Sequence, residues 1–185
     1  MKPANPGPPV IGIAGWKKSG KTTLVSRLIA EFSARGLKIA IVKHAHHGFQ
    51  IDERDTDSAR HRRAGARQVA VVSSKRWALI NELESAPEPT LDEVVSWIGP
   101  CDLIIVEGYK AAPIPKIEVR RSGAVSQVPL AGEHPDIRAI AADYAIDDKQ
   151  LQVFALDDIA GIADFIAATV GITAPRSAAA ATPVE

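Results

Sequence analysis

The 185-residue sequence has a single cysteine, Cys101, and no excess of charge of either sign. One cysteine excludes an intrachain disulfide framework and any zinc site built from several cysteines. Because 22 Lys and Arg balance 22 Asp and Glu, no broad field is available to hold nucleic acid or an anionic membrane. Aromatic residues make up only 5%, which is few for stacking on bases. We therefore expect a protein of the reducing cytoplasm whose partners are neither nucleic acid nor membrane.

Long hydrophobic runs are also missing. No stretch approaches the roughly 20 apolar residues that a membrane-spanning helix needs. The short apolar run at 10–16 meets two lysines without a small-residue cleavage site, so it does not fit a signal peptide. The length suits one domain, and the two ends lack any pattern that would bury a face. We expect a disordered extension over 1–9, one folded domain over 10–173 and a flexible Ala/Pro-rich tail over 174–185.

Short apolar runs alternate with helical patterns between these ends. Strands are expected at residues 10–14, 38–43, 68–73, 78–80, 102–106, 117–121 and 139–142, and helices at 21–35, 90–98 and 157–169. The alternating strand at 117–121 has the pattern of a sheet edge, and 68–73 is expected to pair with 78–80. Strands that alternate with helices predict the α/β class, with a mostly parallel sheet flanked by helices in three layers.

The clearest motif is a phosphate-binding loop after the first expected strand. Residues 15–22 read Gly-Trp-Lys-Lys-Ser-Gly-Lys-Thr, which satisfies the pattern G-x-x-x-x-G-K-[ST] in full. In such a loop Lys21 supplies charge to the β- and γ-phosphates, and the Thr22 hydroxyl ligates Mg²⁺. The alternative is a glycine-rich turn that binds nothing, but the position between a strand and an amphipathic helix favours a nucleotide. The residues expected to bind the nucleotide here are Gly15, Lys18, Ser19, Gly20, Lys21 and Thr22. Trp16 would lean over the nucleotide or pack beneath the loop.

A phosphate loop needs an acidic partner for Mg²⁺, and Glu107 is the best-placed candidate. Glu107 ends the apolar run 103–106, and ligands bind at the carboxyl ends of parallel strands. Its alternative role is to cap the next turn, whereas Asp102 begins the same strand and belongs at the opposite edge. Asp52 and Asp57 would contact Mg²⁺ through water or orient an attacking water. The expected metal ligands are thus Thr22, Glu107 and Asp52, and the expected catalytic residues are Lys21, Glu107 and Asp57.

Histidines and arginines cluster after the second expected strand. His44, His46 and His47 suit a metal site, a sensor of the γ-phosphate or a polar active-site loop without metal, and their spacing is no standard metal signature. A dense basic run follows at 54–67. Three interpretations of this run stay open: an anion pocket, a surface for an acidic partner and a solvated helix face. Lys116 and Arg120, on the expected edge strand, would extend such a basic surface.

Several segments together resemble the molybdopterin-guanine dinucleotide biosynthesis protein B family. They are the phosphate loop through Thr23, Val42-Lys43-His44 with His46, His47 and Asp52, Asp57-Ser58 with Arg60, Val106-Glu107-Gly108-Tyr109-Lys110, and Pro115-Lys116-Ile117-Glu118-Val119 with Arg121. The phosphate loop alone is shared by very many proteins, whereas the Lys-His-x-His-His segment and the run from Glu-Gly-Tyr-Lys to Lys-Ile-Glu-Val are much more discriminating. The resemblance covers residues 11–165.

The resemblance implies a P-loop NTPase-like fold and a GTP-binding adapter of molybdenum cofactor biosynthesis, with weak Mg²⁺-dependent GTPase activity. Its partners would be molybdopterin and the guanylyltransferase that joins GMP to molybdopterin, and the chain would form a homodimer. Gly20, Lys21, Thr22 and Thr23 would hold the phosphates of GTP. One departure is Asp55-Thr56-Asp57, where the family pattern has Gly-Lys-Asp, although Asp57 still aligns.

Guanine preference is the point that the motifs leave open. GTPases usually read guanine through the Asp of an Asn-Lys-x-Asp sequence, which this chain does not contain. Asp143, directly after the strand at 139–142, is the available substitute. Two other functions stay open: a small-molecule kinase that uses the run 54–67 as its lid, and a GTPase that delivers a metal bound by His44, His46 and His47.

Overall fold

The computed structural model of the chain describes residues 7–45, 49, 51 and 56–173. No helix within those residues is long and apolar enough to cross a membrane. The chain divides into two compact units, Met1–His44 with Leu91–Glu185, and Ala45–Thr90. We call the first the main unit and the second the insert. The expected domain spans both units, and its boundaries and the two terminal segments stay predictions.

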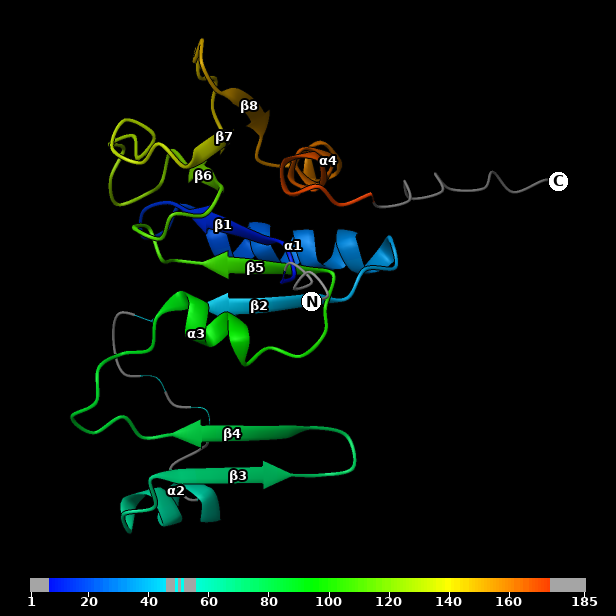
Figure 1. Ribbon diagram of the computed structural model, residues 1–185. Helices are drawn as coiled ribbons and strands as arrows, with labels where there is room; N and C mark the ends of the chain where they lie inside the picture. The colour runs from blue at the N-terminus through cyan, green and yellow to red at the C-terminus, as the bar shows by residue number, and fades with distance from the viewer. Residues whose placement is uncertain (1–6, 46–48, 50, 52–55, 174–185) are drawn as a thin grey trace, which may run out of the picture. The chain divides into compact units, whose positions relative to one another are not determined.

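The main unit is built on a six-stranded sheet in which every neighbouring pair of strands is parallel. The strand order is β2-β5-β1-β6-β7-β8. The strands are β1 (Val10–Ala14), β2 (Ile39–Lys43), β5 (Leu103–Glu107), β6 (Lys116–Arg120), β7 (Ile137–Ala142) and β8 (Gln152–Ala155), and the helices are α1 (Lys21–Ala34), α3 (Leu91–Ser96) and α4 (Ile159–Val170). Figure 1 shows α1 running alongside β1 and β5. The expected α/β class is therefore confirmed.

Helices cover both faces of this sheet, as the strand β5 demonstrates. Leu103 and Ile105 join a core formed with α1 and α4, whereas Ile104 and Val106 join a second core formed with α3. All five residues of β5 are buried. Burying one such side chain contributes about 1.5–3 kcal/mol, so the two cores fix the strand ends that carry the loops.

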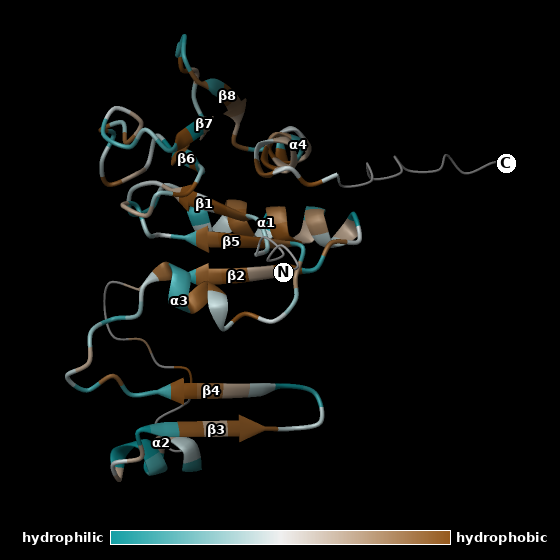
Figure 2. Cartoon of the chain, in the orientation of Figure 1, coloured by the Kyte–Doolittle hydropathy of each residue, from teal (hydrophilic) through white to brown (hydrophobic). Residues whose placement is uncertain are grey.

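The described part of the insert consists of a short helix and a β-hairpin. The helix α2 (Asp57–Arg63) begins after Thr56, whose hydroxyl accepts a hydrogen bond from the Ala59 amide. Strands β3 (Gln68–Val72) and β4 (Trp77–Asn81) pair antiparallel, as expected. Both strands are largely hydrophobic (Figure 2). Nevertheless, Ala59 is the only hydrophobic side chain in the described part of the insert that is buried.

The sequence-based prediction of a sheet edge at 117–121 is wrong. That segment corresponds to β6, which lies between β1 and β7. Its alternation arises because Ile117 and Val119 enter the core with α1 and α4, while Glu118 and Arg120 form an ion pair at 2.8 Å. Lys116 is 1% exposed and donates to carbonyl oxygens of the preceding turn. Neither Lys116 nor Arg120 therefore extends a basic surface.

The sequence-based prediction also omits β8. This strand has only four residues, and two of its side chains are exposed. Four residues are too few to show either a continuous apolar run or a clear alternation of apolar and polar residues, which are the two patterns that indicate a strand.

Candidate nucleotide-binding site

The phosphate-binding loop joins the end of β1 to the start of α1, and its backbone is tightly folded. The Ser19 amide donates to the Trp16 carbonyl at 3.1 Å. Gly15, with φ of +155°, has no room for a side chain, since a Cβ there would lie 2.6 Å from the Val119 carbonyl oxygen. Gly20 caps α1 in a left-handed conformation and contributes no side-chain hydrogen bond. The first N–H groups of α1 and the positive end of its dipole are thus available to an anion.

Lys21 is folded back onto this loop. Its Nζ donates to the Trp16 carbonyl oxygen at 2.7 Å. Burial lowers the pKa of Lys21 from its ordinary value, and the positive charges of Lys110 and Lys43 lower it further against the opposing effect of Glu107. A polyanion placed on the loop would favour the charged form of Lys21, so this ammonium is suited to binding phosphate groups.

Thr22 and Glu107 meet at the carboxyl edge of the sheet. The Thr22 hydroxyl donates to Glu107 Oε1 at 2.8 Å, and Lys43 Nζ lies 3.5 Å from the same oxygen. Glu107 is the last residue of β5 and lies in register with Ile13 of β1, so two adjacent strands bring it to the phosphate loop. A hydroxyl and a carboxylate are hard oxygen ligands of the kind that Mg²⁺ prefers, and the pair fits this ion. Its role in metal binding stays a prediction.

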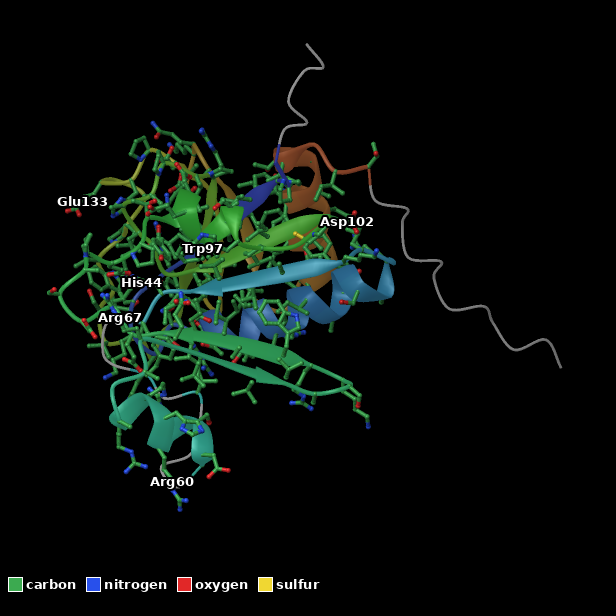
Figure 3. All side chains as sticks on the ribbon, turned by 60° about the horizontal axis from the view of Figure 1, so that its bottom comes forward. His44, Arg60, Arg67, Trp97, Asp102 and Glu133 are labelled. Atoms are coloured by element: carbon green, nitrogen blue, oxygen red, sulfur yellow. The ribbon has the colours of Figure 1, made fainter. Side chains whose placement is uncertain are left out.

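Asp102 lies at the opposite edge of the same sheet, as expected. Its carboxylate accepts a hydrogen bond from the Lys38 amide, before β2 begins. Figure 3 shows Asp102 and His44 at opposite ends of the strands. The polarity of the sheet thus separates Glu107 from Asp102, although the two are only five positions apart in the sequence.

A pocket of about 570 Å³ lies beside the phosphate loop. Its lining consists of Lys18, Gly20, Lys21, Thr22, Thr23, Arg121, Ser122, Gly123 and Asp143. The first five are residues of the loop and of the start of α1 that the sequence predicts to hold phosphates. Gly15 and Ser19 are not among the lining residues, and the Ser19 hydroxyl is buried and has no hydrogen-bond partner among the described residues.

Asp143 lies at the end of β7, across the pocket from the phosphate loop. Its carboxylate accepts hydrogen bonds from the Ser122 amide at 2.8 Å and the Ser122 hydroxyl at 3.1 Å. Arg121 Nε lies 3.5 Å from the same carboxylate. These contacts fix the orientation of Asp143. No motif in the sequence marks Ser122 and Gly123 as lining residues, although the segment after β6 is another carboxyl end of the same parallel sheet.

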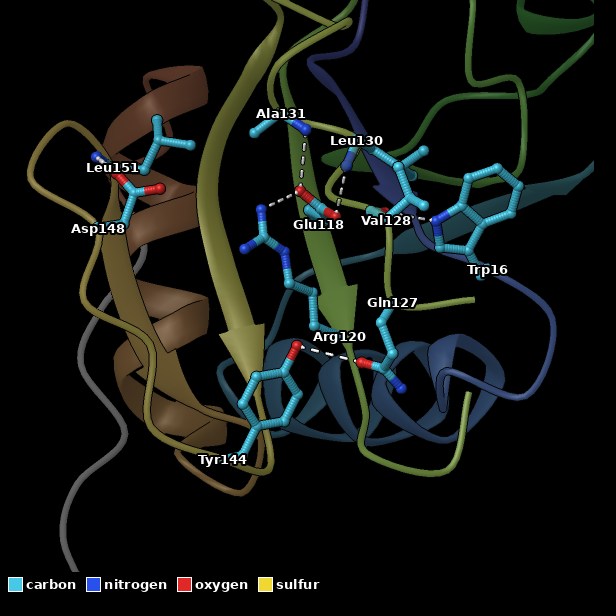
Figure 4. Close-up of polar contacts among 10 residues, drawn as sticks. All are labelled: Trp16, Glu118, Arg120, Gln127, Val128, Leu130, Ala131, Tyr144, Asp148 and Leu151. Atoms are coloured by element: carbon cyan, nitrogen blue, oxygen red, sulfur yellow. Dashed lines mark hydrogen bonds and ion pairs between the residues drawn. The ribbon is translucent and has the colours of Figure 1, made fainter. Parts of the chain in front are cut away.

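The Trp16 side chain packs against the protein and is not among the residues that line the pocket, which favours packing over a position above the nucleotide. The indole joins a small apolar cluster that includes Ala14 and Leu130. Its Nε1 donates to the Val128 carbonyl oxygen at 2.7 Å (Figure 4). Lys110 Nζ lies 3.9 Å from the ring centroid, a cation–π distance.

Of the three histidines considered as metal ligands, His44, His46 and His47, only His44 lies within the described residues. Its amide donates to the Glu107 carbonyl at 2.9 Å, and its ring lies 4.6 Å from that of Tyr109. His46, His47, Asp52 and Asp55 lie outside the described residues. The structure shows no cluster of metal-binding side chains in the part of the chain that it describes. The histidine metal site and the Mg²⁺ ligand Asp52 stay predictions.

Asp57 and most of the basic run belong to the insert. Asp57 begins α2, its side chain is 87% exposed, and it lies 3.6 Å from Arg60. Within the basic run, Arg62 pairs with Glu82 at 2.7 Å and Arg67 with Glu84 at 3.5 Å. These pairs satisfy part of the charge within the insert itself. The catalytic role of Asp57 stays a prediction.

Comparison with known proteins agrees with the resemblance that the motifs indicate. Residues 10–143 match the family described as molybdopterin guanine dinucleotide synthesis protein B. The chain is 38% identical to the molybdopterin-guanine dinucleotide biosynthesis adapter protein of Haemophilus influenzae, over 85% of this chain and 87% of that protein. It is 37% identical to the adapter protein of the same name from Escherichia coli, over 85% and 91% of the two chains.

Solved structures agree with these sequence matches. The crystal structure of molybdopterin-guanine biosynthesis protein B superimposes with a TM-score of 0.67 and 26% identity, over 86% of this chain and 99% of that one. A homologue of this protein from Bacillus stearothermophilus gives a TM-score of 0.62, also at 26% identity, over 88% and 97% of the two chains. The chain therefore belongs to the molybdopterin guanine dinucleotide synthesis protein B family.

Proposed function

We propose that the chain is a GTP-binding adapter in molybdopterin guanine dinucleotide synthesis. One observation carries this proposal. A complete phosphate loop lies at one edge of the sheet, and there the Thr22 hydroxyl is hydrogen-bonded to the Glu107 carboxylate. The relatives named as adapter proteins support the place of this site in the pathway. The partners would be molybdopterin and the guanylyltransferase that joins GMP to it, in the cytoplasm.

Asp143 would select guanine over adenine. A carboxylate can accept from both the ring N–H and the exocyclic amine of guanine, whereas the corresponding edge of adenine lacks this pair of donors. Asp143 lines the same pocket as the phosphate loop, and Ser122 holds its carboxylate in place. Because a carboxylate has about four acceptor positions, lone pairs remain for the base.

Magnesium would be held by Thr22 and Glu107, with Asp52 as a further predicted ligand. Mg²⁺ held there would neutralise charge on the phosphates, and Lys21 would add a second positive charge. Among the described residues, the pocket lining contains no histidine and no carboxylate other than Asp143. We therefore expect hydrolysis to be slow, so that GTP binding serves mainly to alter how the adapter meets its partner.

The insert would form a homodimer contact. One face of its hairpin carries Val72, Trp77 and Leu79, which are 75%, 71% and 48% exposed, together with Ala70. An isolated two-stranded hairpin is marginally stable, so its apolar face benefits from a cover. A second copy of the same face, related by a twofold axis, would supply one. Trp77→Glu should then halve the molar mass measured by light scattering, and an unchanged dimer would exclude this face.

The first test is calorimetric titration of the purified full chain with GTP, ATP and GMP in the presence of Mg²⁺. We expect preference for GTP, a loss of affinity of about tenfold or more in Lys21→Ala, and loss of the preference alone in Asp143→Asn. Glu107→Gln should keep most of the affinity for nucleotide but reduce the rate of Mg²⁺-dependent GTP hydrolysis. Equal or tighter binding of ATP by the wild type would overturn the guanine assignment and favour the kinase.

A further inference from the structure

Glu118 is a buried carboxylate in the middle of β6. It is 1% exposed, and β6 places it in register with Ala14, the last residue before the phosphate loop. A carboxylate at such a position is stable only if hydrogen bonds compensate for the lost water. Its two oxygens have three donors: the Leu130 amide at 2.8 Å, the Ala131 amide at 3.0 Å and the guanidinium of Arg120 at 2.8 Å (Figure 4).

These hydrogen bonds fasten a long connection to the sheet. Residues 121–136 link β6 to β7 without a helix or strand, and we call them the 121–136 loop. A connection of this length without a helix or strand is uncommon in a compact domain. Glu118 binds two consecutive amides near its centre, and Leu130 is buried there against Ala14. The loop is thereby anchored by a charged group from inside the sheet.

The same loop is bonded directly to the phosphate loop. The Val128 carbonyl accepts from the Trp16 indole at 2.7 Å, and the Val125 amide donates to the Lys17 carbonyl at 3.0 Å. The Trp16 carbonyl is in turn the acceptor for both Lys21 Nζ and the Ser19 amide. A continuous series of contacts therefore leads from the buried carboxylate to the phosphate-binding lysine.

The other end of the 121–136 loop reaches the pocket. Ser122 and Gly123 line it, and Gln127 donates to the carbonyl oxygens of Arg121 and Ser122 at 3.0 Å each. Tyr144, just after β7, donates to Gln127 at 3.4 Å (Figure 4). One loop thus contacts the phosphate loop through its middle and the base-binding side of the pocket through its beginning.

We propose that Glu118 is a positioning residue for the phosphate loop, acting through the 121–136 loop and Trp16. The proposal rests on nucleotide binding at this pocket. The negative charge of Glu118 is needed because each of its oxygens accepts a backbone amide and one also accepts the Arg120 guanidinium. Glutamine offers one acceptor oxygen and an NH₂ group that cannot accept, so Glu118→Gln releases one of the two loop amides.

The test uses the full chain with Mg²⁺ and inorganic tripolyphosphate, a probe that carries no base. Glu118→Gln should lower the affinity for tripolyphosphate by about tenfold, the typical effect of losing one hydrogen bond to a charged group. Trp16→Phe keeps an aromatic ring but removes the indole donor to Val128, and it should lower affinity in the same direction. The double variant should lose little more than the stronger single variant, because both changes interrupt one route.

A spectroscopic measurement separates positioning from general loss of structure. The chain has three tryptophans, so Trp16→Phe assigns the indole N–H signal of Trp16 in ¹H–¹⁵N spectra. In Glu118→Gln this signal should move toward that of an unbonded indole and exchange faster with water. The matched control is Glu133→Gln, which removes the same charge from an exposed position of the same loop. It should change neither the signal nor the affinity.

The outcomes distinguish this proposal from the proposed function. If the wild type binds neither tripolyphosphate nor GTP, the proposed function fails and the positioning role falls with it. If the wild type binds and Glu118→Gln binds equally well, only the positioning role is overturned. A weaker affinity with an unmoved Trp16 signal would overturn the route through Trp16. If Glu118→Gln does not fold, Trp16→Phe decides, and unchanged affinity in that variant would overturn the proposal.

Discussion

Strands β5 and β3 make an instructive comparison, since each has five residues and four of them in each strand are apolar. All five residues of β5 are buried, whereas four residues of β3 are exposed. β5 pairs with a strand on each side and has helices over both faces, while β3 pairs only with β4 within its sheet. The apolar content of a strand therefore does not decide its burial. What decides the burial of a strand is the number of neighbouring strands and helices that the topology places against it.

This difference separates two tasks in the molecule. The phosphate loop leaves β1, which lies between β5 and β6, so the site proposed to hold phosphates is carried by a strand with a neighbour on each side. The insert leaves a hydrophobic hairpin face exposed, and such a face is typical of a contact surface. The main unit is thus suited to binding a small ligand and the insert to association.

The largest difference between the two units is expected in the free energy of unfolding, after one Leu→Ala substitution in each unit. Leu28 is fully buried under the sheet, whereas Leu79 of the hairpin is 48% exposed. Leu28→Ala should lower the free energy of unfolding by about 3–5 kcal/mol, because it leaves a cavity. Leu79→Ala should lower it by less than about 1 kcal/mol. Urea denaturation followed by circular dichroism measures both values.

Denaturation at two protein concentrations sharpens this test. If the hairpin face forms the dimer contact, the effect of Leu79→Ala should vary with protein concentration, whereas that of Leu28→Ala should not. Equal losses in the two variants at every concentration would show that the hairpin is covered within the same chain. The contrast between the two units would then be wrong.

An intermediate effect is expected for two arginines. Arg35 has a side chain that is only 5% exposed. It pairs with Glu31 of α1 at 2.8 Å and with Asp164 of α4 at 2.5 Å, and the second pair joins the end of α1 to α4. Arg35→Met should lower the free energy of unfolding by about 1–3 kcal/mol, since it removes hydrogen bonds between charged groups. Arg62→Met, which removes one pair with Glu82 in the insert, should lower it by less than about 1 kcal/mol. Thermal denaturation ranks the two variants, and a larger loss in Arg62→Met would contradict the comparison.

Local patterns in the sequence predict the parts of the site that are close together in the chain. The loop at 15–22 has its motif within eight residues, and Glu107 is marked by the apolar run that it ends. The sheet then brings these segments together, because parallel strands share one carboxyl edge. This placement needs no knowledge of individual side-chain contacts.

Contacts between distant segments are what the sequence does not predict. The hydrogen bond from Trp16 to Val128 joins residues 112 positions apart, and neither residue type signals the other. The alternation that suggests an edge at β6 comes from Glu118 and Arg120, and the two backbone donors to Glu118 lie in a loop without any periodic pattern. A buried charge and an exposed charge look the same in the sequence, so only the structure distinguishes them.

The smallest difference between the two units is expected when one lysine is removed from each, and it is seen in the pH dependence of phosphate binding. Burial and the positive charges of Lys110 and Lys43 lower the pKa of Lys21, and phosphate binding favours its charged form. Affinity for tripolyphosphate should therefore be highest below that lowered pKa and decline as the pH rises through it, by about tenfold for each pH unit well above it.

Lys43→Met removes one of the positive neighbours of Lys21 and should move the decline to higher pH. Lys75→Met removes an exposed lysine from the insert and should leave the profile unchanged. Calorimetric titration from neutral pH upward measures all three profiles, and a decline that Lys43→Met leaves in place would mean that Lys21 is not the titrating group.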